Sequence, residues 1–211
     1  SSDVCSSDLL FKNRKTFIKY ISCIAIGLPV WFFVGVLVSQ SQDIFSKELG
    51  ADGVLNGMAV SFAYIGLSAG DFLAGFLSQM LKSRKKIIYI FNALLFLLLI
   101  LIVFFIKDVT KEEYYFLIFL GGLSSGIWAI FVTTAAEQFG TNIRSTVANT
   151  VPNFVRGAVV PITHSFTFLA GMYGNLNSAL IVGIFCLAIS SLATYHVEES
   201  FSADLDYFEN S

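Results

Sequence analysis

The chain contains six apolar stretches that are each long enough to cross a lipid bilayer. A helix needs about 20 apolar residues to cross a hydrocarbon core of about 30 Å. Backbone amides cannot stay unpaired in lipid, so stretches of this length are expected to be helical. Charged residues make up 13% of the chain, whereas a soluble domain carries about 25%. We therefore predict an all-α membrane protein with six transmembrane helices, at residues 17–40, 54–81, 87–106, 114–136, 147–172 and 175–195.

The flanks of these stretches define two further regions. Residues 1–15 form an N-terminal extension with a basic lead-in, residues 16–197 form the six-helix bundle, and residues 198–211 form an acidic cytoplasmic tail. Residues 1–9 lack an initiator Met, repeat Ser and Asp, and do not have the basic and apolar regions of a signal peptide. We expect residues 1–9 to be foreign to the natural protein, and the chain to be a fragment of a longer one.

The basic residues between the stretches are distributed unequally. Nine lie on the side that holds both termini, and three lie on the other side. Cytoplasmic loops of membrane proteins are enriched in Lys and Arg, so both termini are expected to be cytoplasmic. We expect an integral protein of a bacterial inner (plasma) membrane. The nine residues are Lys12, Arg14, Lys15, Lys19, Lys82, Arg84, Lys85, Lys86 and Arg144, and the three are Lys47, Lys107 and Lys111.

Two of the predicted helices carry a polar stripe at helical spacing. Polar groups in lipid are costly, and they usually face a bundle interior or a cavity. Two such stripes predict a water-filled or solute-filled cavity between the helices, with Gly66 and Gly70 on the opposite side for close helix packing. The stripe of the second helix is Gly57, Ser61, Tyr64, Ser68, Asp71, Gly75 and Gln79. The stripe of the fifth helix is Asn149, Asn153, Arg156, Thr163, His164 and Thr167.

Asp71 and Arg156 are predicted to lie at similar depth, about 15 Å from the cytoplasmic ends of their helices. They are interpreted either as a structural ion pair or as a solute or proton site. His164 lies further out, as a proton relay or as a side chain satisfied by local hydrogen bonds. Trp31 and Trp128 would stack on a ligand or simply pack. The candidate solute and proton pathway is Asp71, Arg156, Asn153, Asn149, Tyr64, Ser68 and His164.

Other classes of function have little support in the sequence. There is no His, Asp and Glu cluster of a metal site, no nucleophile motif, no phosphate loop and no basic patch of the kind that binds nucleic acid. The three Cys residues lack metal-type or redox-type spacing. We predict that the protein is not an enzyme and needs no metal or cofactor.

Two loops resemble elements of a known transporter family. Residues 137–144 read Glu-Gln-Phe-Gly-Thr-Asn-Ile-Arg, which resembles the Glu-x6-Arg element of the major facilitator superfamily, especially its sugar and metabolite porters. Residues 75–86 occupy the place of the family's Gly-x3-Asp-Arg-x-Gly-Arg-Arg element, but Met80, Leu81 and Ser83 replace its acid, first Arg and second Gly. The resemblance covers residues 16–197 and implies the C-terminal half of such a transporter, helices seven to twelve.

The resemblance implies secondary active transport of a small solute, a sugar or an organic anion, coupled to protons and driven by alternating access. The N-terminal six-helix half would be the partner, and the lipid bilayer the surroundings. An accessory or structural membrane subunit without transport of its own is the alternative. It would show seams of small or apolar residues rather than long polar stripes.

Charged residues at the cytoplasmic ends are predicted to form a gate. Glu137 ends the fourth predicted helix and Arg144 opens the fifth, so that they can pair with each other, with helix ends, or with the basic residues of the second loop. Such pairs would hold the inner ends together while the cavity opens outward. The alternative is an exposed ion pair worth less than about 1 kcal/mol. The predicted gate residues are Glu137, Arg144, Arg84, Lys85 and Lys86.

Overall fold

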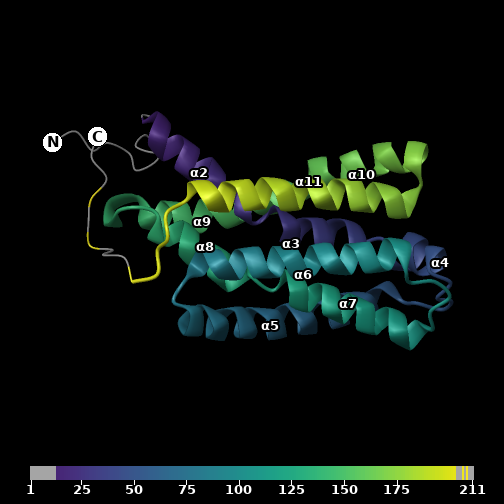
Figure 1. The fold of residues 1–211 in the computed structure, drawn as a ribbon. Helices are drawn as coiled ribbons and strands as arrows, with labels where there is room; N and C mark the ends of the chain where they lie inside the picture. Colours follow the sequence, from purple (N-terminus) through teal and green to yellow (C-terminus); the bar gives the residue numbers. More distant parts are fainter. Residues whose placement is uncertain (1–12, 203–205, 207, 209–211) are drawn as a thin grey trace.

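The computed structural model describes residues 13–202, 206 and 208, and each regular element among them is a helix (Figure 1). The expectations for residues 1–9 and for most of the tail beyond residue 202 lie outside the described residues. The elements are α2 (Arg14–Ile26), α3 (Leu28–Phe32), the π-helical segments η1 (Phe33–Val38) and η2 (Ser41–Phe45), α4 (Ser46–Glu48), α5 (Asn56–Leu81), α6 (Arg84–Phe104), α7 (Lys111–Ser125), α8 (Trp128–Glu137), α9 (Thr141–Gly157), α10 (Val159–Tyr173) and α11 (Asn175–His196).

Among the described residues, five helical segments are long enough and apolar enough to cross a membrane. They are Arg14–Val38, Asn56–Leu81, Arg84–Phe104, Lys111–Glu137 and Asn175–His196. Each matches one of the predicted stretches. Large apolar side chains such as Phe72 and Phe168 are exposed on the outside, as expected of a surface that faces lipid. The fold is therefore that of an all-helical integral membrane protein.

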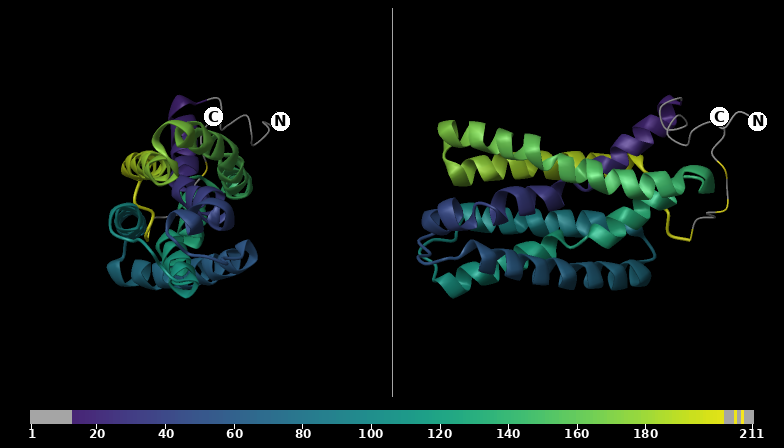
Figure 2. Two further views of the ribbon diagram at one scale, coloured as in Figure 1. Left: turned by 90° about the vertical axis from the view of Figure 1, so that its right-hand side faces the viewer. Right: turned by 180° about the vertical axis from the view of Figure 1, so that it is seen from behind.

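The predicted span at residues 147–172 differs from these five. It is divided between α9 and α10, which meet at Ala158, and neither helix is a candidate span by itself. Pro161 has no N–H to donate to the Gly157 carbonyl, which accounts for the break at this point. The many polar residues of the fifth stripe lower the hydropathy of this segment. The structure therefore supports five of the six predicted spans, and it replaces the sixth with two consecutive helices (Figure 2).

Proline also accounts for an interruption in the first span. Gly27 separates α2 from α3, and Pro29 occupies the first turn of α3. A proline in a first turn needs no hydrogen bond from its own nitrogen. Pro29 and Pro161 thus lie beside interruptions, whereas Pro152 lies inside α9 without one. A third interruption, at Gly126 and Ile127 between α7 and α8, has no proline to signal it.

Both described ends of the chain lie at the same end of the bundle, beside the α5–α6 and α8–α9 turns (Figure 1). Lys19 Nζ donates to the Gln138 carbonyl over 2.9 Å, and Lys85 Nζ donates to the Val197 carbonyl over 2.8 Å. At the other end, the Val109 N–H donates to the Leu49 carbonyl over 3.0 Å. The described members of the basic group therefore gather at one end of the molecule, which we call the basic end. They are Arg14, Lys15, Lys19, Lys82, Arg84, Lys85, Lys86 and Arg144.

Helices α5 and α7 cross at a contact built from glycine. A Cβ added to Gly66 would lie 2.9 Å from the Leu123 nitrogen, and one added to Gly70 would lie 2.8 Å from the Gly126 Cα. The close packing predicted for Gly66 and Gly70 is therefore confirmed. The residues that face them are Gly122 in α7 and Gly126 at the C-terminus of α7, four residues apart. This crossing brings the middle of α5 against the point where α8 begins.

Candidate functional site

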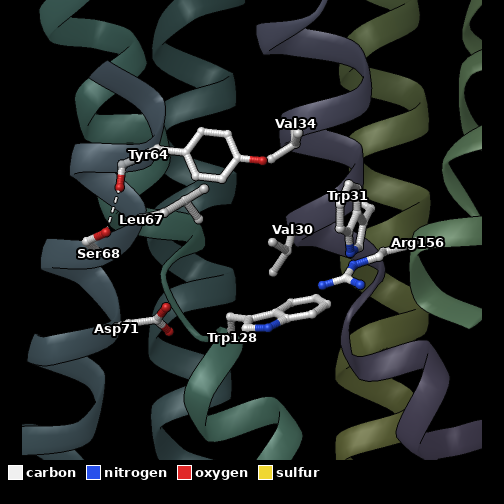
Figure 3. Close-up of a pocket in the computed structure, with 9 residues that line it drawn as sticks. All are labelled: Val30, Trp31, Val34, Tyr64, Leu67, Ser68, Asp71, Trp128 and Arg156. Carbon is white, nitrogen blue, oxygen red and sulfur yellow. Dashed lines mark hydrogen bonds between the residues drawn. The ribbon is translucent and has the colours of Figure 1, made fainter. Parts of the chain in front are cut away.

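A pocket of about 200 Å³ opens near the middle of the bundle (Figure 3). It is smaller than the roughly 300–1,000 Å³ of drug-sized ligand sites, so it suits a small solute. Four of the seven predicted pathway residues line it, and they come from two helices that are far apart in sequence. The lining residues are Val30 and Trp31 of α3, Val34 of η1, Tyr64, Leu67, Ser68 and Asp71 of α5, Trp128 of α8, and Arg156 of α9.

The interruptions of the helices lie beside this pocket. Trp31 follows the break at Gly27, Trp128 is the first residue of α8 after the break at Gly126, and Arg156 comes just before the break at Ala158. Discontinuous helices commonly form the solute sites of transporters, because their ends leave backbone groups and side chains free to face a ligand. The breaks therefore place aromatic and charged side chains at mid-height in the bundle.

Asp71 caps the N-terminus of α8. Its Oδ1 accepts a hydrogen bond from the Ala129 N–H over 3.0 Å. A carboxylate at a helix N-terminus is stabilised by the unpaired N–H groups and by the helix dipole. No ion pair joins Asp71 to Arg156 in the described part of the chain, and in Figure 3 the Trp128 ring lies between them. The structural ion pair considered from the sequence is therefore not formed, and the carboxylate ties α5 to α8 instead.

Arg156 lies against the Trp128 indole. The centre of its guanidinium is 5.7 Å from the Trp128 ring centroid, within the range of a cation–π interaction. Its Nη1 donates to Asn153 Oδ1 over 3.3 Å. Trp31 meets Trp128 edge to face, with ring centroids 6.0 Å apart at 77°. The guanidinium is thus held by one weak hydrogen bond and an aromatic face, and its charge faces the pocket.

The opposite wall of the pocket belongs to α5. The Tyr64 hydroxyl is directed across the pocket toward Val34 (Figure 3). Ser68 Oγ donates to the Tyr64 carbonyl over 2.9 Å, which leaves its oxygen lone pairs available to a ligand. Both side chains belong to exposed residues. This wall can therefore form hydrogen bonds with a solute, as the polar stripe of the second predicted helix indicated.

The other three predicted pathway residues lie outside the pocket. Each hydrogen-bonds to the carbonyl four residues earlier in its own helix: Asn149 to Ser145 over 2.8 Å, Asn153 to Asn149 over 2.9 Å, and His164 to Val160 over 3.0 Å. All three are exposed. Asn153 contacts a pocket residue by accepting the hydrogen bond from Arg156. The placement of His164 matches the local hydrogen-bonding alternative for that residue.

Sequence reasoning missed most of the apolar lining. Trp31 and Trp128 were considered either as stacking residues or as packing residues, and the structure brings both to the pocket. Val30, Val34 and Leu67 carry no sequence signal that separates them from core residues. Val30 and Val34 follow the break that Pro29 marks before α3, whereas α5 is uninterrupted around Leu67.

The residues of the predicted gate lie at the basic end, and Glu137 has one of its predicted partners there. Glu137 pairs with Arg84: Arg84 Nη2 lies 3.1 Å from Glu137 Oε1, and Nε donates to Oε2 over 3.4 Å. Both side chains are 16% exposed, so this pair is much less solvated than a surface ion pair. Arg144 Nε donates to the Phe139 carbonyl over 3.1 Å. Among the partners that the sequence analysis considered for Glu137, the structure therefore has Arg84, the residue that follows the turn between α5 and α6.

Residues 197–201 form a strap across the basic end. The Gln138 side chain makes two hydrogen bonds with the Glu198 backbone, at 2.8 and 3.1 Å, and Ser200 Oγ donates to Glu137 Oε2 over 2.6 Å. Lys85 Nζ donates to the Val197 carbonyl just after the C-terminus of α11. The first part of the predicted acidic tail is therefore packed against the bundle. Lys86 is exposed, and its backbone N–H donates to Ser83 Oγ over 3.2 Å.

Glu199 anchors the strap to the start of α6. Its carboxylate accepts from the Ser83 hydroxyl and from the backbone N–H groups of Arg84, at 2.9 Å, and Lys85, at 3.3 Å. Burial raises the pKa of Glu199, but the hydrogen bonds from Ser83, Arg84, Phe201 and Lys85 outweigh it and hold the pKa below its ordinary value of 4.5. The ionised carboxylate is therefore the form that binds the helix N-terminus.

No family model matches this chain, and no curated protein matches it. Among the described residues, no group of three or more His, Cys, Asp or Glu side chains is placed to hold a metal ion. The resemblance to the major facilitator superfamily thus stays a prediction from the two loop elements.

Proposed function

We propose that this chain is one six-helix half of a secondary active transporter of the major facilitator type. It would carry a small solute, a sugar or an organic anion, by alternating access coupled to protons. In this proposal α9 and α10 together make the remaining membrane crossing, corresponding to helix eleven. The basic end faces the cytoplasm of a bacterial inner membrane, because positively charged loops are retained on that side.

The observation that carries the proposal is the pocket itself. Side chains of α3, α5, α8 and α9 converge at mid-height on one small cavity, and both fixed charges of the predicted pathway line it. Charged side chains within a membrane are costly and usually serve a solute or ion path. Asp71 is the one carboxylate among the nine lining residues and so the candidate proton carrier. Protonation would weaken its cap on α8 and couple proton binding to the packing of α5 on α8.

A second bundle would complete this site. Tyr64 and Ser68 on α5, and Asn149, Asn153 and Arg156 on α9, are exposed polar or charged residues around the pocket. Such a face is unfavourable against lipid. A partner half packed over it would bury these groups around a central cavity, as in transporters whose site lies between two repeats.

The basic end supplies a candidate gate. The Arg84–Glu137 pair joins α6 to α8, and the strap adds α11 through Glu199 and Ser200. When the inner ends separate, these contacts would have to break or shift. An accessory subunit without transport would need neither the pocket nor this coupling, and the convergence of Asp71 and Arg156 on one cavity favours the transporter.

Solute-driven proton movement tests the proposal. Vesicles from cells that express the intact gene, so that any second bundle it encodes is present, are loaded with a pH-sensitive dye and given a panel of sugars and carboxylates. We expect at least one solute to cause a pH change that vesicles without the protein do not show. A panel that produces no such change, with the protein inserted and helical, would contradict the proposal.

A further inference from the structure

The pocket carries a more specific inference about its ligand, which rests on the proposed function. Trp31 Nε1 is buried and has no hydrogen-bond partner among the described residues. A buried N–H without a partner is unfavourable, and each such group in a native structure calls for an explanation. Trp31 and Arg156 both line the pocket and both lie against the Trp128 ring, and Figure 3 draws the Trp31 nitrogen and the Arg156 guanidinium on the same side of the pocket. Two donor groups from different helices therefore converge on one place.

Arg156 has unused donors at the same place. A guanidinium carries five N–H donors. In the described structure the hydrogen bond of Arg156 to Asn153 occupies one of them. Arg donors match the two oxygens of a carboxylate, which they bind more strongly than neutral acceptors. An anionic oxygen between Arg156 and Trp31 would satisfy the indole N–H and neutralise the guanidinium together.

The rest of the pocket limits the body of such a ligand. Val30, Val34, Leu67 and the two indoles form an apolar and aromatic surface. The far wall holds Asp71, whose carboxylate would repel a second negative charge. The α8 N-terminus, where an anion could otherwise bind, is already occupied by that carboxylate.

We propose that the pocket binds a monocarboxylate with a compact apolar or aromatic body, with the carboxylate held between the Arg156 guanidinium and the Trp31 indole N–H. The apolar body lies against Trp128 and the aliphatic wall, and the Tyr64 and Ser68 hydroxyls meet its other end. Neutral sugars lack the charge that Arg156 requires, and dicarboxylates place a charge against Asp71.

The chain supplies its own reporter for this proposal. It contains two tryptophans, and both line the pocket. The full chain in lipid nanodiscs is titrated with cyclohexanecarboxylate, with the neutral cyclohexylmethanol and with cyclohexane-1,4-dicarboxylate, while tryptophan fluorescence is followed. We expect a saturable change with the monocarboxylate, none that saturates with the alcohol, and weaker binding of the dicarboxylate.

Variants separate the two donors. Arg156→Gln should weaken binding of the monocarboxylate about ten-fold or more, since it removes a charge-assisted contact. Trp31→Phe keeps an aromatic ring but removes the N–H, and should weaken binding about three- to ten-fold, with Trp128 as the remaining reporter. Lys107→Gln removes an exposed charge at the other end of the bundle and should leave binding unchanged.

Each contrary result has its own meaning. Equal binding of the alcohol, or binding that survives Arg156→Gln, would overturn the monocarboxylate assignment while leaving the pocket as a solute site. Proton movement driven by a neutral sugar would also overturn the monocarboxylate assignment, and it would support the proposed function. No response to any of the three compounds would overturn the assignment, and the vesicle assay with sugars would then decide the proposed function separately.

Discussion

The glycine crossing of α5 and α7 allows a prediction of stability with an internal control. In Gly70→Ala the new methyl would lie 2.8 Å from the Gly126 Cα and still closer to a backbone carbonyl, and backbone cannot move aside as a side chain can. Overpacking of this kind costs about 3 kcal/mol at its upper end, and the gain in helix propensity returns about 1 kcal/mol. We expect a net loss of about 2 kcal/mol.

Gly75 is the matched control on the same helix, because a Cβ added there meets nothing within 4 Å. Gly75→Ala keeps the propensity gain without a clash, so the two variants should differ by about 3 kcal/mol. For a protein of this size that corresponds to about 6–12 °C in Tm.

A thiol-reactive dye can follow thermal unfolding in detergent, since Cys23 and Cys186 are buried and free in the folded state. Equal melting temperatures for Gly70→Ala and Gly75→Ala would refute the close crossing and, with it, the position of Asp71 at the start of α8.

Three further predictions concern the basic end. The lowered pKa of Glu199 means that its ionised form stabilises the docked strap above pH 4.5, and that this contribution is lost as the pH falls through the lowered pKa. A nitroxide attached at Glu198→Cys should therefore become mobile on acidification, and Glu199→Gln should abolish that change with pH. Glu137→Gln should weaken the contact with Arg84 by about 1–2 kcal/mol and slow the transport cycle more than it weakens solute binding; equal rates in Glu137→Gln and the unaltered protein would remove the gate assignment. Lys82→Cys and Lys107→Cys, both at exposed residues, should be labelled from opposite sides of the membrane, and labelling of both from one side would contradict the topology.

Hydropathy could locate the membrane helices because the cost of lipid exposure acts on each residue separately. It could not predict the fate of residues 147–172, where polar side chains and Pro161 divide the segment into α9 and α10. The stripe of α5 placed Tyr64, Ser68 and Asp71 on one face, because helical periodicity fixes which side chains share a face, and all three line the pocket. Periodicity does not reveal partners across the bundle.

The other differences between the predictions and the structure concern which groups the polar side chains bind. The Asp71 carboxylate binds α8 rather than Arg156, because the Gly126 break presents unpaired backbone N–H groups directly beside it. Residues 198–201 belong to the predicted acidic tail, and their contacts depend on Ser83 and Gln138, which are ordinary polar residues in the sequence. Such contacts follow from tertiary packing and carry no local signature.

The most direct test of a water-accessible solute pocket in the middle of the bundle is thiol modification on α5. In a cysteine-free background within lipid nanodiscs, Ser68→Cys lines the pocket, whereas Leu73→Cys is an exposed position on another face of the same helix. A membrane-impermeant methanethiosulfonate reagent should modify Ser68→Cys, more slowly in the presence of a bound carboxylate, and should leave Leu73→Cys unmodified in lipid. An unreactive Ser68→Cys, or equal modification of both positions, would contradict the account.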